Sequence, residues 1–418
     1  MKNLLFYRPN TSLNLLCILL LFSGLPSVIK FSHISEFFNF VQINLLYGLF
    51  SLLRESIILL LGIQLISYLF IQIKRERISY LTLIFLIPIP SFIYLILNDF
   101  NLILFIIGIR FFILISLPLL VIKKFNQLRK YDKTKILDII FILYFLLNFS
   151  FYLFNYNIAS DGHGYNFLGP RLTFIYNHPV VAAMTLGAIN LYFNFRIFTS
   201  KNKNTRLFFL TNSLITFFLT LLTGGRAGIA ASLLIIIFST IRSFLPDFKK
   251  YLLIPKSKIN NFIILGIIGI FTASTIFAVS LESISGRPIF DEISNKNFLV
   301  GFYGTRGEIL SRALNPDNSL RLIFGSPGVG TNTAKLFNIC EECIISDSSL
   351  TAFLLSFGLL GWLLIITHLK ILLTNSYSFL IPITYFIFSL TDNLPEYLFP
   401  WITIVLLLSL SPKITSKK

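Results

Sequence analysis

Residues 101–122 read NLILFIIGIRFFILISLPLLVI, and Arg110 is the one charged side chain in this run. A helix needs about 20 mainly apolar residues to cross the hydrocarbon core of a bilayer. The backbone finds no water at that depth, so the segment satisfies its own hydrogen bonds only as a helix. This stretch therefore predicts a transmembrane helix.

Similar apolar runs fill most of the chain. Apolar residues make up 55% of the 418 positions and charged residues 13%, whereas roughly a quarter of a soluble domain is charged. We therefore predict an all-α polytopic membrane protein in which residues 1–418 form a single transmembrane domain. Its spans, about twelve in number, are expected at 12–29, 56–73, 79–97, 101–122, 136–154, 178–196, 206–222, 227–245, 259–281, 349–370, 377–391 and 397–411.

The basic residues predict which side each loop faces, because Lys and Arg accumulate on the cytoplasmic side of a membrane. The apolar segment 37–53 runs directly into Arg54-Glu55 without a loop, so we interpret it as an interfacial or re-entrant helix that does not cross. Most of the 35 Lys and Arg residues then fall on one side. Both termini are expected in the cytoplasm.

The formal net charge of +17 has the same explanation. Positive-inside topology and contact with anionic lipid account for such an excess. No basic and aromatic motif points to nucleic acid. Membrane lipid is therefore an expected partner, and nucleic acid is not.

Two cysteines, Cys340 and Cys343, form C-E-E-C on the predicted outer side. A local disulfide suits an oxidising compartment. A single C-x-x-C without a second pair of ligands is weak evidence for zinc, so we expect no metal.

Two segments on the predicted outer side hold most of the basic residues that oppose the charge rule: a smaller extracytoplasmic loop at 155–177 and one large extracytoplasmic loop at 282–348. The smaller loop carries Asp161 and Arg171 and ends beside His178, where a span begins. Turn formation and helix capping explain these residues as well as a catalytic or anion-binding role does. We retain Asp161 and His178 as candidate bases and Arg171 as a candidate anion ligand.

Arg226 lies in Thr223-Gly224-Gly225-Arg226-Ala227-Gly228, which joins two spans on the predicted outer side with almost no loop. This places Arg226 at the N-terminus of a helix, where free N–H groups and the helix dipole favour an anion such as phosphate. An arginine that snorkels to the outer headgroups is the structural alternative. We favour phosphate binding, because an arginine at the membrane edge is costly without a partner.

The large loop offers three more candidates. Thr305-Arg306-Gly307-Glu308 has the form of a capping box and predicts a short helix on the membrane surface, with Arg306 directed toward a lipid phosphate. Arg312 follows Glu308 by four residues, so a salt bridge within the helix also explains it. Asp347, just before the next span, is explained either by helix capping or as a base.

Two further features have mainly structural interpretations. The stretch Gly325-Ser326-Pro327-Gly328-Val329-Gly330 lacks the lysine of a nucleotide-binding loop, so we predict a tight turn. Arg110 lies in the middle of a span, where a charge usually faces the bundle interior, and we treat it as a candidate for a cavity or a proton path.

The order of these motifs resembles the O-antigen polymerase and O-antigen ligase family of bacterial cell envelopes. The matching motifs are R-L-T-F-I-Y-N-H-P at 171–179, T-G-G-R-A-G at 223–228, R-G-E-I-L-S-R-A-L at 306–314, I-F-G-S-P-G-V-G at 323–330, D-S-S-L at 347–350 and F-G-L-L-G at 357–361. Each motif is loose, and their order carries the resemblance.

The resemblance implies a GT-C-like fold in the bacterial cytoplasmic (inner) membrane. It implies transfer of an undecaprenyl-diphosphate-linked oligosaccharide on the outer face, without a nucleotide sugar, metal or other cofactor. Arg226 and Arg306, with Arg312 and Arg171, would hold the donor diphosphate, and a carboxylate or imidazole would take the acceptor proton. A flippase and a chain-length regulator are the protein partners that it implies.

Ligases commonly carry a histidine before the helix that closes the large loop. This chain has Asp347 in that region, which favours the polymerase that joins repeat units. A lipid-linked-glycan flippase or another transporter is the alternative of a different class, but we find no internal repeat, and the one-sided loop favours an enzyme. A purely structural subunit ranks last, because it leaves the outer arginines unexplained.

Overall fold

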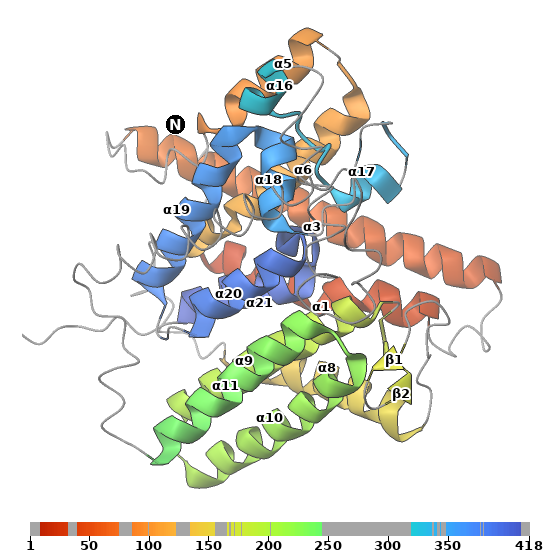
Figure 1. The fold of residues 1–418 in the computed structure, drawn as a ribbon, viewed down its shortest axis with the longest axis vertical. Helices are drawn as coiled ribbons and strands as arrows, with labels where there is room; N and C mark the ends of the chain where they lie inside the picture. Colours follow the sequence, from red (N-terminus) through yellow and green to blue (C-terminus); the bar gives the residue numbers. More distant parts are fainter. Residues whose placement is uncertain are drawn as a thin grey trace, which may run out of the picture.

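A computed structural model describes residues 9–31, 40–74, 86–98, 100–122, 134–154, 165–166, 169–170, 172–176, 178–200, 202–244, 319–336, 338–340, 343, 348–376, 378 and 380–410. These residues are almost entirely helical (Figure 1). The elements are α1 (Pro9–Phe31), α3 (Phe40–Lys74), α5 (Pro88–Asn98), α6 (Leu102–Ile122), α8 (Thr134–Leu153), β1 (Tyr165–Asn166), β2 (Gly169–Pro170), α9 (Pro179–Thr199), α10 (Lys203–Thr223), α11 (Arg226–Phe244), α16 (Ser319–Phe324), α17 (Asn332–Leu336), α18 (Ser349–Phe357), α19 (Leu359–Asn375), α20 (Leu380–Thr391), the 3-10 helix η2 (Leu394–Glu396) and α21 (Leu398–Leu410).

The described helices confirm the all-α class and the membrane character of the chain. Five of the described segments have the length and apolar composition to cross a membrane: Asn44–Leu69, Leu102–Val121, Thr134–Leu153, Pro179–Thr199 and Lys203–Thr223. Six more described apolar segments are shorter, at 10–17 residues. The predicted span 259–281 lies outside the described residues.

The interpretation of 37–53 as a separate interfacial helix is wrong. Residues 40–74 form one continuous helix, α3, which passes through Arg54-Glu55 without a break. At a rise of about 1.5 Å per residue this helix is roughly 50 Å long, well beyond the thickness of the hydrocarbon core. The part of α3 with the length and composition of a span is Asn44–Leu69, which begins before the predicted span 56–73.

The predicted span 349–370 is two helices rather than one. Gly358 separates α18 from α19 with a φ of +63°, a left-handed conformation that glycine adopts without strain. A side chain here would also overlap the carbonyl oxygen of Ile323, because α16 packs directly against the break. The break therefore depends on a tertiary contact with a segment about 35 residues earlier.

Helices α8, α9, α10 and α11 lie together at one end of the molecule in Figure 1, and α20 and α21 lie between them and α5, α6 and α16–α18. Nearly every side chain of α9 is buried, so α9 forms the centre of this end. Its polar side chains bond to its neighbours: Asn190 accepts from Ser213 of α10, and Asn194 donates to Ser239 of α11. Hydrogen bonds of this kind hold helices together where the hydrophobic effect is absent.

The proline in α6 leaves a carbonyl group that contacts the C-terminal helices. Pro118 has no N–H, so the carbonyl of Leu114 loses its normal helical donor. The indole Nε1 of Trp401, fully buried on α21, donates to that oxygen at 2.8 Å. One residue further along α6, the carbonyl of Ile115 lies 2.6 Å from Nε2 of the buried His368 on α19.

We expect Trp401→Phe to destabilise the protein. Phenylalanine keeps most of the apolar contact but leaves the Leu114 carbonyl buried without a donor, and an unsatisfied group of this kind costs about 1–3 kcal/mol. The readout is the thermal midpoint of the detergent-solubilised protein by size-exclusion chromatography, with Trp362→Phe as the matched tryptophan control. Equal midpoints for Trp401→Phe and wild type would contradict a stabilising role for the hydrogen bond from Trp401 to the Leu114 carbonyl.

Candidate functional site

The predicted start of the α9 span and the Gly-Gly-Arg corner between α10 and α11 lie side by side. A Cβ added at Gly225 would lie 3.3 Å from the carbonyl oxygen of Pro179, and Gly228 packs against the backbone of Ala183. The backbone N–H of Leu172 donates to Leu222 at 3.1 Å, which fastens the chain before α9 to the end of α10. The structure therefore brings together two helix N-termini that are nearly 50 residues apart in sequence.

His178 is the N-cap of α9. Its Nδ1 accepts a hydrogen bond from the N–H of Val180 at 3.2 Å, and Pro179 occupies the first turn. A neutral histidine whose Nδ1 is an acceptor carries its proton on Nε2. His178 would therefore have to give up the cap before it acted as a base through Nδ1. Nearby Tyr176 is fully buried, and burial raises the pKa of its hydroxyl, which keeps it protonated.

Arg226 is the first residue of α11, and its side chain is exposed. The helix before it closes at Gly224, whose φ of +63° allows the chain to reverse within two residues. The guanidinium charge thus adds to the positive end of the α11 dipole, next to the start of α9. Both features favour an anion at this corner.

Helix α20 meets α9 and α11 just below this corner. A Cβ added at Gly187 would lie 3.0 Å from Cζ of Phe388 and 3.5 Å from the Cα of Gly228. Glycines at both positions allow the three helices to approach this closely. The outer end of α20 therefore lies near the Arg226 corner.

Sequence reasoning missed the connection between α20 and α21, Asp392-Asn393-Leu394-Pro395-Glu396. Ser349, the first residue of α18, donates to the carbonyl of Asp392 at 3.1 Å and accepts from the N–H of Leu394 at 3.0 Å. The hydroxyl of Tyr397 donates to Oδ1 of Asp392 at 3.0 Å. Ser349 belongs to the D-S-S-L motif at 347–350. This motif therefore contacts the connection between α20 and α21 through Ser349.

Glu396 in the same connection binds the end of the large loop. Its carboxylate accepts from the N–H groups of Asn332 and Thr333 at 2.6 and 3.3 Å and from the Thr333 hydroxyl at 2.7 Å. Asn393 adds a fourth hydrogen bond at 2.9 Å. The carboxylate thus caps α17 across more than 60 residues of sequence.

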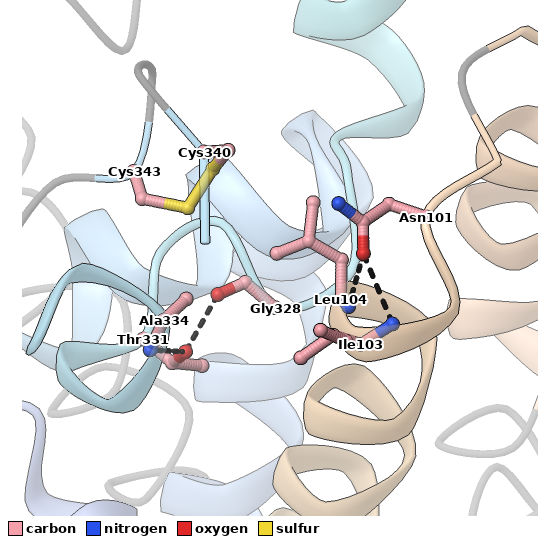
Figure 2. The surroundings of a disulfide bond; sticks show 8 residues. All are labelled: Asn101, Ile103, Leu104, Gly328, Thr331, Ala334, Cys340 and Cys343. Carbon is pink, nitrogen blue, oxygen red and sulfur yellow. Dashed lines mark hydrogen bonds between the residues drawn. A yellow bond between two sulfur atoms is a disulfide. The ribbon is translucent and has the colours of Figure 1, made fainter. Parts of the chain in front are cut away.

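The predicted disulfide and the predicted turn are both present, and they pack on α5 and α6. Figure 2 shows the Cys340–Cys343 bond beside the turn that carries Gly328 and Thr331. Gly328 lies against the first turn of α6, where a Cβ would be 2.8 Å from the carbonyl oxygen of Leu104. Cys343 is buried against Leu104 and its neighbours, so apolar contacts hold the loop on α5 and α6, and the disulfide closes a turn within the loop.

Arg110 has a partner inside the chain. Its guanidinium Nε lies 2.7 Å from the carboxylate of Glu55 on α3, and Arg54 lies 3.0 Å from the same carboxylate. Two guanidinium groups thus share one carboxylate at the seam between α3 and α6. An ion pair accounts for Arg110 without a cavity or a proton path.

The remaining candidates, Asp161, Arg171, Arg306, Arg312 and Asp347, lie outside the described residues. Within the described part of the chain, no three His, Cys, Asp or Glu side chains lie close enough to hold a metal ion. The site is therefore a cationic corner at Arg226 and a carboxylate-bearing connection at Asp392. No protein-family model, no curated protein and no solved structure matches the chain.

Proposed function

We propose that this protein is an O-antigen or polysaccharide polymerase of the bacterial cytoplasmic membrane. It would transfer a growing undecaprenyl-diphosphate-linked glycan onto the next lipid-linked repeat unit at the outer face, within a GT-C-like arrangement of spans. The observation that carries the proposal is the Arg226 corner: an exposed guanidinium at one helix N-terminus beside a second helix N-terminus. Both features attract the oxygens of a diphosphate.

The leaving group explains why such a corner suits this reaction. As the bond between the sugar and the diphosphate breaks, negative charge grows on the departing diphosphate. A guanidinium offers planar, permanently charged donors to these oxygens, which supplies the stabilisation that a metal supplies in other transferases. The side chain of Arg226 is exposed at the predicted outer end of α11.

The test compares envelope glycans of the native host on a gel for wild type, a deletion strain, and deletion strains that carry Arg226→Ala or Arg226→Lys at equal membrane abundance. We expect Arg226→Ala to remove the long ladder and retain the single-repeat glycan, because loss of one such donor lowers turnover by about 10²–10³-fold. Lysine restores the charge but not the bidentate geometry, so a shortened ladder is expected.

Arg206→Ala is the matched control, since Arg206 is an exposed arginine at the opposite end of α10. It should keep the full ladder. Loss of every capped form in the deletion strain would instead favour an O-antigen ligase or a lipid-linked-glycan flippase. An unchanged ladder in the deletion strain would refute glycan assembly as the function.

A further inference from the structure

The ion cluster between α3 and α6 carries more positive than negative charge. Nε of Arg110 lies 2.7 Å from the carboxylate of Glu55, and the guanidinium of Arg54 lies 3.0 Å from the same carboxylate. Two positive charges against one negative charge leave a net charge of +1. Asp138, by contrast, forms an ion pair with Arg196 at 2.7 Å. The Glu55 cluster thus has a charge that its own three residues do not balance.

Residue counts place this cluster near the middle of both helices. The segments with the length and composition of a span are Asn44–Leu69 in α3 and Leu102–Val121 in α6. Arg54 lies ten residues after the start of the first segment and Arg110 eight after the start of the second. These offsets are roughly 15 and 12 Å at about 1.5 Å per residue, and half of the hydrocarbon thickness is also about 15 Å. We therefore expect phospholipid headgroups to lie too far away to balance the charge.

An exposed apolar face surrounds the cluster. Gly48, Leu52, Glu55 and Leu59 follow one another at spacings of three or four residues, so they share one face of α3. Leu52 and Leu59 are 66% and 62% exposed, and Ile106 on α6 is 56% exposed. A Cβ added at Gly48 would find no neighbouring atom within 4 Å. The face is therefore open to a further membrane-embedded segment.

The charged side chains can be reached from this face. The exposed fractions are 24% for the side chain of Arg54, 39% for that of Glu55 and 19% for that of Arg110. Arg110 bonds to both carboxylate oxygens of Glu55, at 2.7 and 3.2 Å, whereas Arg54 reaches only Oε1. A carboxylate brought to this face would thus meet a cluster that is partly open and short of one negative charge.

The chain offers no further carboxylate at this depth. Across the predicted spans, Asp138 is the one acidic residue, and it already pairs with Arg196. The predicted span 259–281, which lies outside the described residues, contains neither Asp nor Glu. A second copy of the chain has the same shortage, and two copies in contact through this face would bring two positive clusters together. Like charges repel strongly where the dielectric constant is low.

We propose that this face of α3 and α6 docks a transmembrane helix of a second membrane protein, and that this helix carries one carboxylate near its middle. The added carboxylate would give the cluster two positive and two negative charges. An unbalanced charge at the centre of a bilayer is costly, so its neutralisation favours association. The apolar side chains around the cluster provide packing for the rest of the docked helix.

The experiment uses the full-length protein in vesicles of zwitterionic phosphatidylcholine at mildly alkaline pH, with a photoreactive amino acid in place of Leu59. The probes are two synthetic helices of about 20 apolar residues that differ only in a central Glu or Gln. We expect the Glu helix to crosslink about three- to thirtyfold more than the Gln helix, the range for polar contacts between transmembrane helices. The assay needs no turnover, so its result is independent of the polymerase function.

Variants of Arg54 test whether the excess charge causes this preference. Arg54→Leu leaves Arg110 and Glu55 as a balanced pair, so it should crosslink both probe helices equally. Arg54→Lys keeps the charge and should keep the preference. Arg54→Gln takes the place of Arg54→Leu if the latter does not accumulate in membranes. The positional control carries the photoreactive group at Leu214 of α10, which is 50% exposed, and should show no preference.

Four results would overturn the docking site. Wild type could crosslink both probe helices equally, or the preference could persist in Arg54→Leu or be equally strong at Leu214. Loss of the preference after anionic phosphatidylglycerol is added would show that a lipid phosphate balances the cluster instead. A crosslinked dimer of the chain in the absence of both probes would assign the face to a second copy.

Discussion

Replacing Glu55 with leucine is expected to destabilise the protein more than any other single change in the described helices. The carboxylate of Glu55 balances two guanidinium groups, at 2.7 Å from Arg110 and 3.0 Å from Arg54. Removing one partner from a buried ion pair costs about 3–5 kcal/mol, because the remaining charge stays uncompensated in a medium that solvates it poorly. The thermal midpoint in detergent and the abundance in membranes should both fall.

The surroundings of this ion cluster explain why the cost is large although 39% of the Glu55 side chain is uncovered. The neighbouring side chains Leu52, Leu59, Ile106 and Ile109 are themselves exposed and apolar. On helices of membrane-spanning length, a surface of this composition is expected to face hydrocarbon rather than water. We therefore expect little of the solvent screening that weakens ion pairs on soluble proteins.

Three variants separate the ion pair from simple packing. Arg54→Leu should be nearly neutral, since it leaves Arg110 and Glu55 as a balanced pair. Arg110→Leu combined with Glu55→Leu should be less destabilising than Glu55→Leu alone, because the double variant removes both charges of the pair. Equal losses in the single and the double variant would show that the carboxylate is not needed to balance Arg110.

Helices whose signal lies within their own sequence were predicted well. The runs around α6, α8, α9 and α10 are long and apolar, and the structure places a helix on each of them within a few residues. The error at 37–53 arose because Arg54-Glu55 looks like a boundary in the sequence. Inside the helix, Glu55 pairs with both Arg54 and Arg110, and no local pattern predicts its contact with Arg110 across 55 residues.

The candidate site shows the same contrast between features with a local sequence signal and features that depend on a tertiary contact. Arg226 was predictable because Gly-Gly-Arg between two spans defines a helix start from local residues alone. The bond between Ser349 and Asp392 was not, because it joins residues 43 positions apart and each of them looks like an ordinary turn or cap. The signal available was two carboxylates within a five-residue connection between two spans.

Glu396→Ala is expected to release the end of the large loop from the C-terminal helices. The carboxylate caps α17 through the N–H groups of Asn332 and Thr333 and also binds the Thr333 hydroxyl and Asn393. Hydrogen bonds to charged groups contribute about 1.5–3 kcal/mol each, but Glu396 is partly exposed and shared bonds are not additive, so we expect a total of about 3 kcal/mol.

The disulfide provides a direct readout of this release. The N–H of Ile339 donates to the carbonyl of Ala334 at 3.1 Å, so Cys340 follows directly from the helix that Glu396 caps. Loosening α17 should expose the buried Cys343 and accelerate reduction of the disulfide, measured by the mass shift after a bulky maleimide labels the freed thiols. Glu396→Gln keeps one acceptor oxygen and should fall between alanine and wild type. Reduction of all three proteins at one rate would mean that α5 and α6, rather than Glu396, hold this loop.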